Sequence, residues 1–375
     1  MSATPEPEQL GPPTTLYEHA LRLHRAHPDG PLPRNGEPYP GDRRRLWQDD
    51  PEWSTDERRK GARAAAILDA HFARASARPA DLVDAFHHVH VPSRPNDHIS
   101  AVARRVDHQR VRQTGRWLVR HAANPDAASI GLALLASVWE DDDIPLIQTI
   151  GLLSRGFAPL AVHALERRPG STEALLWLAE RVTGWGRVYV VDSLCARSGT
   201  FARDWLLRRA CDGDFLNRYF AGKVATVAHL HEAITRVDTD SELVDHTGRL
   251  LATMAESDGM GLTLAHYPPA RVVLEAHLGH ARPLAATVER YFVNARLADY
   301  LDRAGEELTW PPGDRERIRD GYLSLLDRDD WSEVARAGLA ADNFGMSWLA
   351  GEVALRLGLR ALVPPGPAPG HAPEV

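Results

Sequence analysis

The sequence contains few cysteines, few lysines and no long hydrophobic run. Its 375 residues include two cysteines, Cys195 and Cys211, which excludes a scaffold held by several disulfides and a four-cysteine zinc site. The longest apolar run, residues 130–139, has about half the length of a membrane-spanning helix. Residues 1–13 are acidic and rich in proline, unlike a signal peptide. We therefore expect a cytoplasmic protein that does not cross a membrane.

Positive charge comes almost entirely from arginine, because lysine occurs only at Lys60 and Lys223. The net charge of -7 argues against nucleic acid or an anionic membrane as partner, since both repel an acidic surface. One predicted long helix, residues 99–121, carries Arg104, Arg105, Arg110, Arg112, Arg116 and Arg120. Their spread around the helix favours a solvated face. An arginine-mediated nucleic-acid binder remains an alternative.

The fold prediction is an all-α protein, an α-solenoid-like stack of helical hairpins. From residue 56 onward, apolar residues recur at helical spacing between proline and glycine interruptions, and we expect the last helix, 331–357, to be broken near Asp342-Asn343. Residues 188–191 are typical of a strand, but no matching strand accompanies them and we interpret them as helix. We expect a disordered tail at 1–13, a helix and proline-rich loop at 14–55, a helical-repeat region at 56–237, a C-terminal helical region at 238–363 that continues the stack, and a disordered tail at 364–375.

An internal spacing of 29 residues supports the repeat. It separates three residue types that commonly cap helices, Asp142, Ser171 and Thr200. It also relates Ile147 to Leu176 and Trp205, and Leu153 to Val182 and Cys211. Because a short helix with one apolar face cannot bury that face alone, we predict that the copies stack. Ile147, Leu176 and Trp205 are then expected to be buried at equivalent positions, unless the spacing is a coincidence.

A Gly-Trp-Gly-Arg corner at 184–187 and a Trp-Leu-Leu-Arg run at 205–208, followed by Cys211, mark this middle region. The stretch 130–220 resembles the HEAT-like and armadillo-like helical-repeat proteins. More narrowly, it resembles an uncharacterised bacterial group that carries the same corner. The resemblance implies an α-solenoid and no known activity.

Few residues suggest chemistry. His87, His88 and His90 form the densest histidine cluster, with Asp84 on the same helical face, and are weak candidates for metal ligands. A helix end before Pro92 explains them without a metal. The acidic run 140–143 is interpreted as the start of a helix, where carboxylates are favoured. The sequence has no phosphate-binding loop and no nucleophile elbow. We therefore predict no cofactor and no catalytic residue.

The ten tryptophans are the feature most suggestive of binding. Most must anchor helices to one another, but one or two in a groove would form a hot spot for a partner. We take Trp185, Arg187 and Tyr189 as candidate interaction residues. The predicted function is a protein-binding or scaffold module whose groove holds a protein or peptide. The alternative is a small-molecule enzyme, with or without a metal, whose pocket lies between helices. Both cysteines are expected to be buried and inert.

Overall fold

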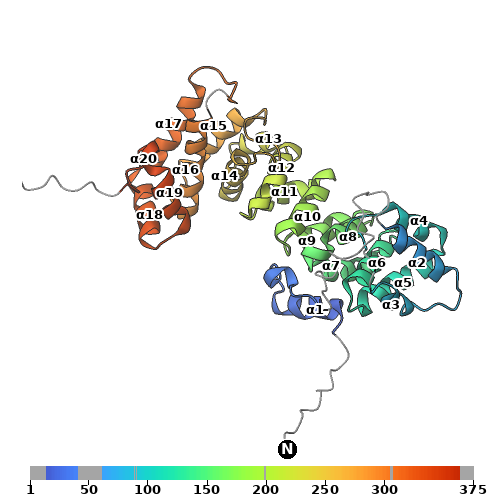
Figure 1. The fold of residues 1–375 in the computed structure, drawn as a ribbon. Coiled ribbons are helices and arrows are strands. Elements are labelled where there is room, and N and C mark those ends of the chain that lie inside the picture. The colour runs from blue at the N-terminus through green and yellow to red at the C-terminus, as the bar shows by residue number, and fades with distance from the viewer. Residues whose placement is uncertain are drawn as a thin grey trace, which may run out of the picture. The chain divides into compact units, whose positions relative to one another are not determined.

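The computed structural model describes residues 14–40, 61–87, 89, 91–197, 200–304 and 307–363. Within these ranges every regular element is a helix, which confirms the all-α class. None of the described helices is both long and apolar enough to cross a membrane. The two predicted tails lie outside the described residues. The chain divides into two compact units, Met1–Arg197 and Ser198–Val375, which we call unit 1 and unit 2 (Figure 1).

The helices of unit 1 alternate between two layers. They are α1 (Leu16–Ala26), α2 (Ala62–Phe72), α3 (Asp81–Ala85), α4 (Asp97–Arg105), α5 (His108–His121), α6 (Pro125–Leu135), η3 (Asp141–Asp143), α7 (Ile144–Gly151), α8 (Ser154–Glu166), α9 (Ser171–Ala179) and α10 (Gly184–Ala196). Each of the pairs α5–α6, α7–α8 and α9–α10 is in contact. In addition α6 contacts α8 and α8 contacts α10, while α5 contacts α7 and α7 contacts α9. One layer therefore holds α5, α7 and α9, and the other holds α6, α8 and α10.

The centre of unit 1 lies around α6, most of whose residues are buried. Glycine allows α5 and α6 to pack closely. A Cβ atom at Gly131 would lie 2.9 Å from the carbonyl oxygen of Gly115, and a Cβ at Gly115 would lie 3.0 Å from that of Gly131. Any larger side chain at this crossing would force the two helices apart.

The N-terminal segment packs along unit 1 through residues near the short helix η1 (Pro33–Gly36). The Asn35 side-chain oxygen accepts hydrogen bonds from the hydroxyls of Ser154 and Thr183, both at 3.1 Å. The Tyr39 hydroxyl donates to the carbonyl of Leu153 at 3.1 Å. These contacts join the beginning of the chain to the starts of α8 and α10.

The predicted helix 99–121 is wrong as a single element. Helix α4 ends at Arg105, Val106 is extended, and the Asp107 carboxylate caps α5 by accepting from the backbone N–H of Arg110 at 2.9 Å. Apolar residues keep their helical spacing from α4 into α5, so the periodicity alone gave no sign of a break. Aspartate is a strong N-cap residue, and it was the signal for the break.

The first two copies of the 29-residue spacing lie on helices that are in contact, but their equivalent residues are not equally buried. The helices near its first two copies, α7 and α9, are in contact. Ile147 is fully buried, but Leu176 is half-buried, and Leu175 and Leu178 fill the core position in α9 instead. Trp205 belongs to unit 2, where it is buried.

The predicted caps at Asp142 and Ser171 are not formed. Asp142 lies inside η3, and α9 starts at Ser171 with Gly170 as its N-cap and no side-chain cap bond. The Ser171 hydroxyl instead accepts a hydrogen bond from Arg197 at 3.5 Å. A capping residue must lie just before the first helical turn. Ser171 is already the first residue of α9, so it cannot cap that helix.

Unit 2 also alternates between layers. Its helices are α11 (Thr200–Arg209), η4 (Phe215–Tyr219), α12 (Ala221–Val227), α13 (Leu230–Ile234), α14 (Ser241–Ala255), α15 (Ala270–Ala281), α16 (Val288–Arg303), α17 (Asp314–Leu326), α18 (Asp329–Ala340), α19 (Phe344–Glu352) and α20 (Ala354–Leu357). Helices α14, α16 and α18 contact one another in sequence, as do α13, α15 and α17. The predicted change of region at 237–238 falls inside this unit, between α13 and α14.

Three further expectations are confirmed. Both cysteines are buried. The predicted break near Asp342 and Asn343 separates α18 from α19, because Asp342 adopts a left-handed backbone with φ of 52° and Asn343 caps α19. Residues 188–191 lie within α10, as predicted.

Candidate interaction surface

Helix α10 presents two of the three predicted interaction residues on one side. Trp185 is 44% exposed and Tyr189 is half-buried. Their ring centres lie 6.1 Å apart, as expected for residues four apart on a helix. Asp192, one turn further, is also exposed. Helical geometry therefore brings Trp185 and Tyr189 side by side.

Arg187 lies on the opposite side of α10 and is 7% exposed. Its guanidinium donates hydrogen bonds to the carbonyls of Ala179 at 2.8 Å and Val182 at 3.5 Å. These carbonyls close the end of α9, so Arg187 ties α9 to α10 within unit 1. The structure therefore gives Arg187 a position inside the protein, separate from the two aromatic side chains.

The glycines of the 184–187 corner determine how α10 starts and how closely it packs against α8. Gly184 begins the helix with a positive φ of 58°, a conformation that glycine adopts without strain. At Gly186 a Cβ atom would lie 2.5 Å from the Cβ of Ser154. The close approach of α10 to α8 thus requires glycine at position 186, and it turns Trp185 outward.

Arg94 completes this surface, and the sequence gave no sign of it. Its guanidinium donates to the Tyr189 hydroxyl at 3.1 Å and lies 5.7 Å from the centre of the Tyr189 ring. Arg94 belongs to the chain between α3 and α4, 95 residues away from Tyr189. We call Arg94, Trp185, Tyr189 and Asp192 the α10 patch.

The neighbouring helix α8 adds charges of both signs. Arg155 forms an ion pair with Glu37 at 2.8 Å. His163 lies 3.5 Å from Glu166 on the same helix, and the hydrogen bond from His163 lowers the pKa of Glu166 below its ordinary value. Both signs of charge therefore occur on α8, as they do within the α10 patch at Arg94 and Asp192.

The histidine cluster is described only in part. His87 is exposed, while His88 and His90 lie outside the described residues. No group of three or more histidine, cysteine or carboxylate side chains suited to a metal occurs among the residues that the structure describes. The helix preceding the cluster, α3, ends at Ala85.

A buried ionic cluster is the main feature that the sequence missed. Asp143, interpreted as part of a helix start, lies directly before α7 and is completely buried. It accepts hydrogen bonds from Arg112 at 2.9 Å and from Arg116 at 2.6 Å, and Arg168 lies 4.0 Å away. Arg112 and Arg116 are four residues apart on α5, so both reach the same carboxylate. These two arginines are structural, which corrects their assignment to a solvated face.

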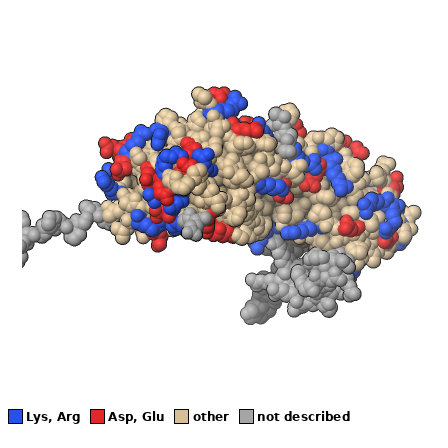
Figure 2. All heavy atoms as spheres, turned by 90° about the horizontal axis from the view of Figure 1, so that it is seen from above, with Lys and Arg blue, Asp and Glu red and all other residues tan. Residues whose placement is uncertain are grey.

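Arginine is paired with carboxylates throughout the described parts of both units. Ion pairs that join different elements include Arg105–Asp69, Arg203–Glu232, Arg208–Asp240, Arg290–Asp245, Arg296–Glu256 and Arg319–Asp302. Figure 2 shows basic and acidic side chains interspersed over the face that it displays. Much of the arginine charge is therefore neutralised within the chain.

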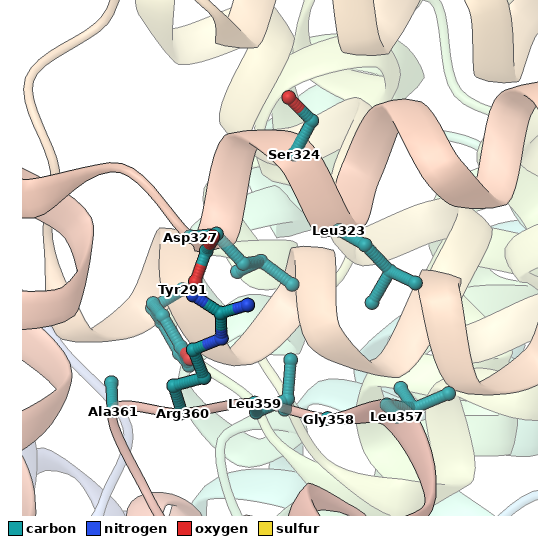
Figure 3. Close-up of a pocket in the computed structure, with 10 residues that line it drawn as sticks. Tyr291, Leu323, Ser324, Asp327, Leu357, Gly358, Leu359, Arg360 and Ala361 are labelled. Atoms are coloured by element: carbon teal, nitrogen blue, oxygen red, sulfur yellow. The ribbon is translucent and has the colours of Figure 1, made fainter.

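A small hollow in unit 2 is the candidate for the enzyme alternative. It has a volume of about 220 Å³ and lies between α16, α17 and residues 357–361. Figure 3 shows the Asp327 carboxylate and the Arg360 guanidinium close to Tyr291. Burial, with a further contribution from the Asp327 charge, raises the pKa of Tyr291 to about 12.

The chemistry of this hollow is limited. The Tyr291 phenol stays protonated at neutral pH because its pKa is raised, so it can donate a hydrogen bond but cannot act as a base. Asp327 and Arg360 are exposed to solvent. The described lining consists otherwise of leucines, Ser324, Gly358 and Ala361, a set without a paired nucleophile and base.

Comparisons of this chain with protein-family models, with curated proteins and with solved structures found no match. The resemblance to HEAT-like and armadillo-like proteins therefore stays a prediction from the sequence.

Proposed function

We propose that this chain is a protein-binding scaffold of the α-solenoid type, which holds a protein or peptide against the α10 patch. The observation that carries this proposal is the aromatic pair Trp185 and Tyr189 on one side of α10, with Arg94 bonded to the Tyr189 hydroxyl. Tryptophan, tyrosine and arginine are the residue types most enriched at binding hot spots.

The solenoid part of the proposal is supported by the packing within each unit. In unit 1, consecutive helices pair, and every second helix contacts the next member of its own layer. The same alternation occurs in unit 2, where α16 pairs with α17 and contacts α14 and α18. Such nearest-neighbour packing is the pattern of helical repeats, which commonly serve as binding surfaces.

The rigidity of the α10 patch favours binding. A side chain that is already held in place loses less conformational entropy when a partner covers it. Tyr189 is held by the Arg94 hydrogen bond, and Trp185 lies against Tyr189. Nucleic acid is a poor partner in this proposal, because the chain has a net charge of -7 and much of its arginine is paired with carboxylates.

The test places a photo-reactive phenylalanine analogue at position 185 in the native host, identifies the cross-linked protein and then measures its affinity in purified form. We expect Trp185→Ala to weaken binding by about 30-fold or more, the effect of losing a hot spot of about 2 kcal/mol. Trp139→Ala is the matched control. Trp139 is 53% exposed in the same unit and lies under Arg167, away from α10 in the sequence.

Two outcomes would contradict the proposal. One is cross-linking at position 139 as efficient as at 185, which would indicate nonspecific capture. The other is a purified partner whose affinity is unchanged by both Trp185→Ala and Tyr189→Ala. Binding of a DNA duplex that weakens steeply with salt and requires the α5 arginines would favour the nucleic-acid alternative.

A further inference from the structure

Helix α1 is an amphipathic helix that covers part of unit 1. It lies against α5 and α7, which are neighbours in one layer. Its buried residues are Leu16, His19 and Ala20. Leu23, one turn further, is half-buried. These positions follow the spacing i, i+3, i+4 and i+7, which is the anchor pattern of a helix that docks on an apolar surface of another protein. Helix α1 therefore occupies unit 1 in the way that a separate helical ligand would.

The start of α1 is stabilised by its own sequence. The Glu18 backbone N–H donates to the Thr15 hydroxyl, and the Thr15 backbone N–H donates to the Glu18 carboxylate, both at 3.1 Å. This capping box satisfies two of the N–H groups that the first turn leaves unpaired. Further along the helix, the Arg22 guanidinium donates to the His19 ring at 3.1 Å. Unit 1 thus supplies α1 with a surface for its apolar side, whereas its N-terminal cap is local.

An aromatic and cationic pair receives the other end of α1. The Trp177 ring of α9 meets the His24 ring in a T-shaped arrangement, with centres 5.4 Å apart. The Arg181 guanidinium lies 4.5 Å from the centre of the Trp177 ring and donates to the carbonyl of Pro28 at 2.9 Å. Tryptophan and arginine are enriched where binding energy is concentrated. We call the surface of α5, α7 and α9 that α1 covers the α5–α9 face.

The fit of α1 to the α5–α9 face is incomplete at His24. The Nδ1 atom of this side chain is buried and has no hydrogen-bond partner among the described residues. A buried polar atom without a partner weakens docking, and an apolar side chain in its place avoids that penalty. The face is therefore better matched to a helix with an apolar residue at this position than to α1 itself.

We propose that the α5–α9 face is a binding site for an amphipathic helix, and that residues 14–40 are an autoinhibitory segment that blocks it. The partner helix carries apolar residues at the positions of Leu16, Ala20, Leu23 and His24. A covalently attached segment acts at a high effective concentration, on the order of millimolar. A partner therefore binds when its own affinity exceeds that of α1 or when the segment is loosened. Helix α10 belongs to the other layer of unit 1, so this inference does not depend on the function proposed for the α10 patch.

The test uses a fluorescent peptide of residues 14–40 and measures its anisotropy with the full chain. In the Leu16→Asp chain a carboxylate replaces a completely buried side chain, so the attached segment should leave and the peptide should bind. The wild-type chain should bind the peptide at least about tenfold more weakly, because the attached segment competes. Ala26→Asp is the matched control, since Ala26 is exposed at the end of α1, and it should behave like the wild type.

Two altered peptides test the chemistry of the site on the Leu16→Asp chain. A peptide that itself carries Leu16→Asp should not bind. A His24→Leu peptide should bind about tenfold more tightly than the wild-type peptide, because it removes the unpaired nitrogen from the contact with Trp177. A His24→Leu peptide that binds more weakly would contradict the proposed partner chemistry.

A second measurement changes none of the described residues and so avoids variants that fail to fold. A protease site is inserted between residues 40 and 61 of the wild-type chain, and excess labelled peptide is added before and after cleavage. Cleavage ends the tethering, so the peptide should replace the original segment only in the cut chain. Equal binding to the wild-type and Leu16→Asp chains, no binding to a folded Leu16→Asp chain, or no exchange in the cut chain would overturn the proposal.

Discussion

Replacing Asp143 with alanine should destabilise unit 1 strongly. The carboxylate is completely buried between Arg112 and Arg116, and the neighbouring Arg168 side chain is also fully buried. Arg168 donates to the carbonyls of Glu140, Leu135 and Val138, so it cannot turn toward solvent without breaking them. Burial lowers the pKa of the Arg168 guanidinium, and the Asp143 charge opposes this. Without Asp143, three guanidinium groups share a poorly solvated site with no buried counter-ion.

The expected magnitude follows from this geometry. Removing one partner of a buried ionic group costs about 3–5 kcal/mol. With a urea dependence of about 2 kcal/mol/M, the midpoint of unfolding should fall by roughly 2 M. Tryptophan fluorescence during urea unfolding measures it. Asp142→Asn is the control, because that side chain is 88% exposed and 3.8 Å from Arg112, and it should cost at most about 1 kcal/mol. Equal effects of the two substitutions, or a shift below about 0.5 M for Asp143→Ala, would refute the reasoning.

Three further predictions test the packing and the pH dependence. Ile147→Ala should cost about 2–5 kcal/mol, and Leu176→Ala clearly less because Leu176 is half-buried; urea unfolding compares them. Gly186→Ala should destabilise the protein by about 1–3 kcal/mol, because the added Cβ would clash with α8. Gly279 lies in a helix with open space around it, so Gly279→Ala should stabilise the protein by up to about 1 kcal/mol. Thermal melts compare the two variants. Burial lowers the pKa of His277 to about 4 in the folded chain. As the pH falls from 6.5, His277 is therefore protonated in the unfolded chain before it is protonated in the folded chain. The free energy of unfolding should fall by roughly 3 kcal/mol between pH 6.5 and 4. His277→Gln should flatten that slope, and an unchanged slope would remove His277 as its source.

The sequence predicted those features that depend on residues close together in the chain, such as helix formation and some helix breaks. Helical spacing established the all-α class, and the Asp342-Asn343 pair marked a helix break because both residue types tolerate turn conformations. The break after Arg105 was missed because apolar periodicity ran through it, although Asp107 was a good cap. Ser171 has the right side chain for a cap, but the position of the helix start is set by packing.

In the candidate surface, too, contacts between residues close in sequence were predictable and contacts between distant residues were not. Trp185 and Tyr189 are four residues apart, and helical geometry alone puts them together. The same geometry puts Arg187, two residues from each, on the opposite side, so its burial was predictable once 184–196 was taken as helix. Arg94 was not predictable, because nothing local relates it to Tyr189. The helix start at Asp143 was predicted, but its burial was not, because that depends on arginines from α5 and from just after α8.

The N-terminal segment has a consequence for synthesis on the ribosome. Asn35 and Tyr39 are made early, but their hydrogen-bond partners follow 114 to 148 residues later. At about 5–20 residues per second, the segment waits roughly 6–30 s before Leu153, Ser154 and Thr183 are synthesised. Unit 1 therefore cannot complete its fold in the order of its sequence. Asn35 and Tyr39 are among the last residues of the unit to find their partners, and until then their polar groups are hydrogen-bonded to water.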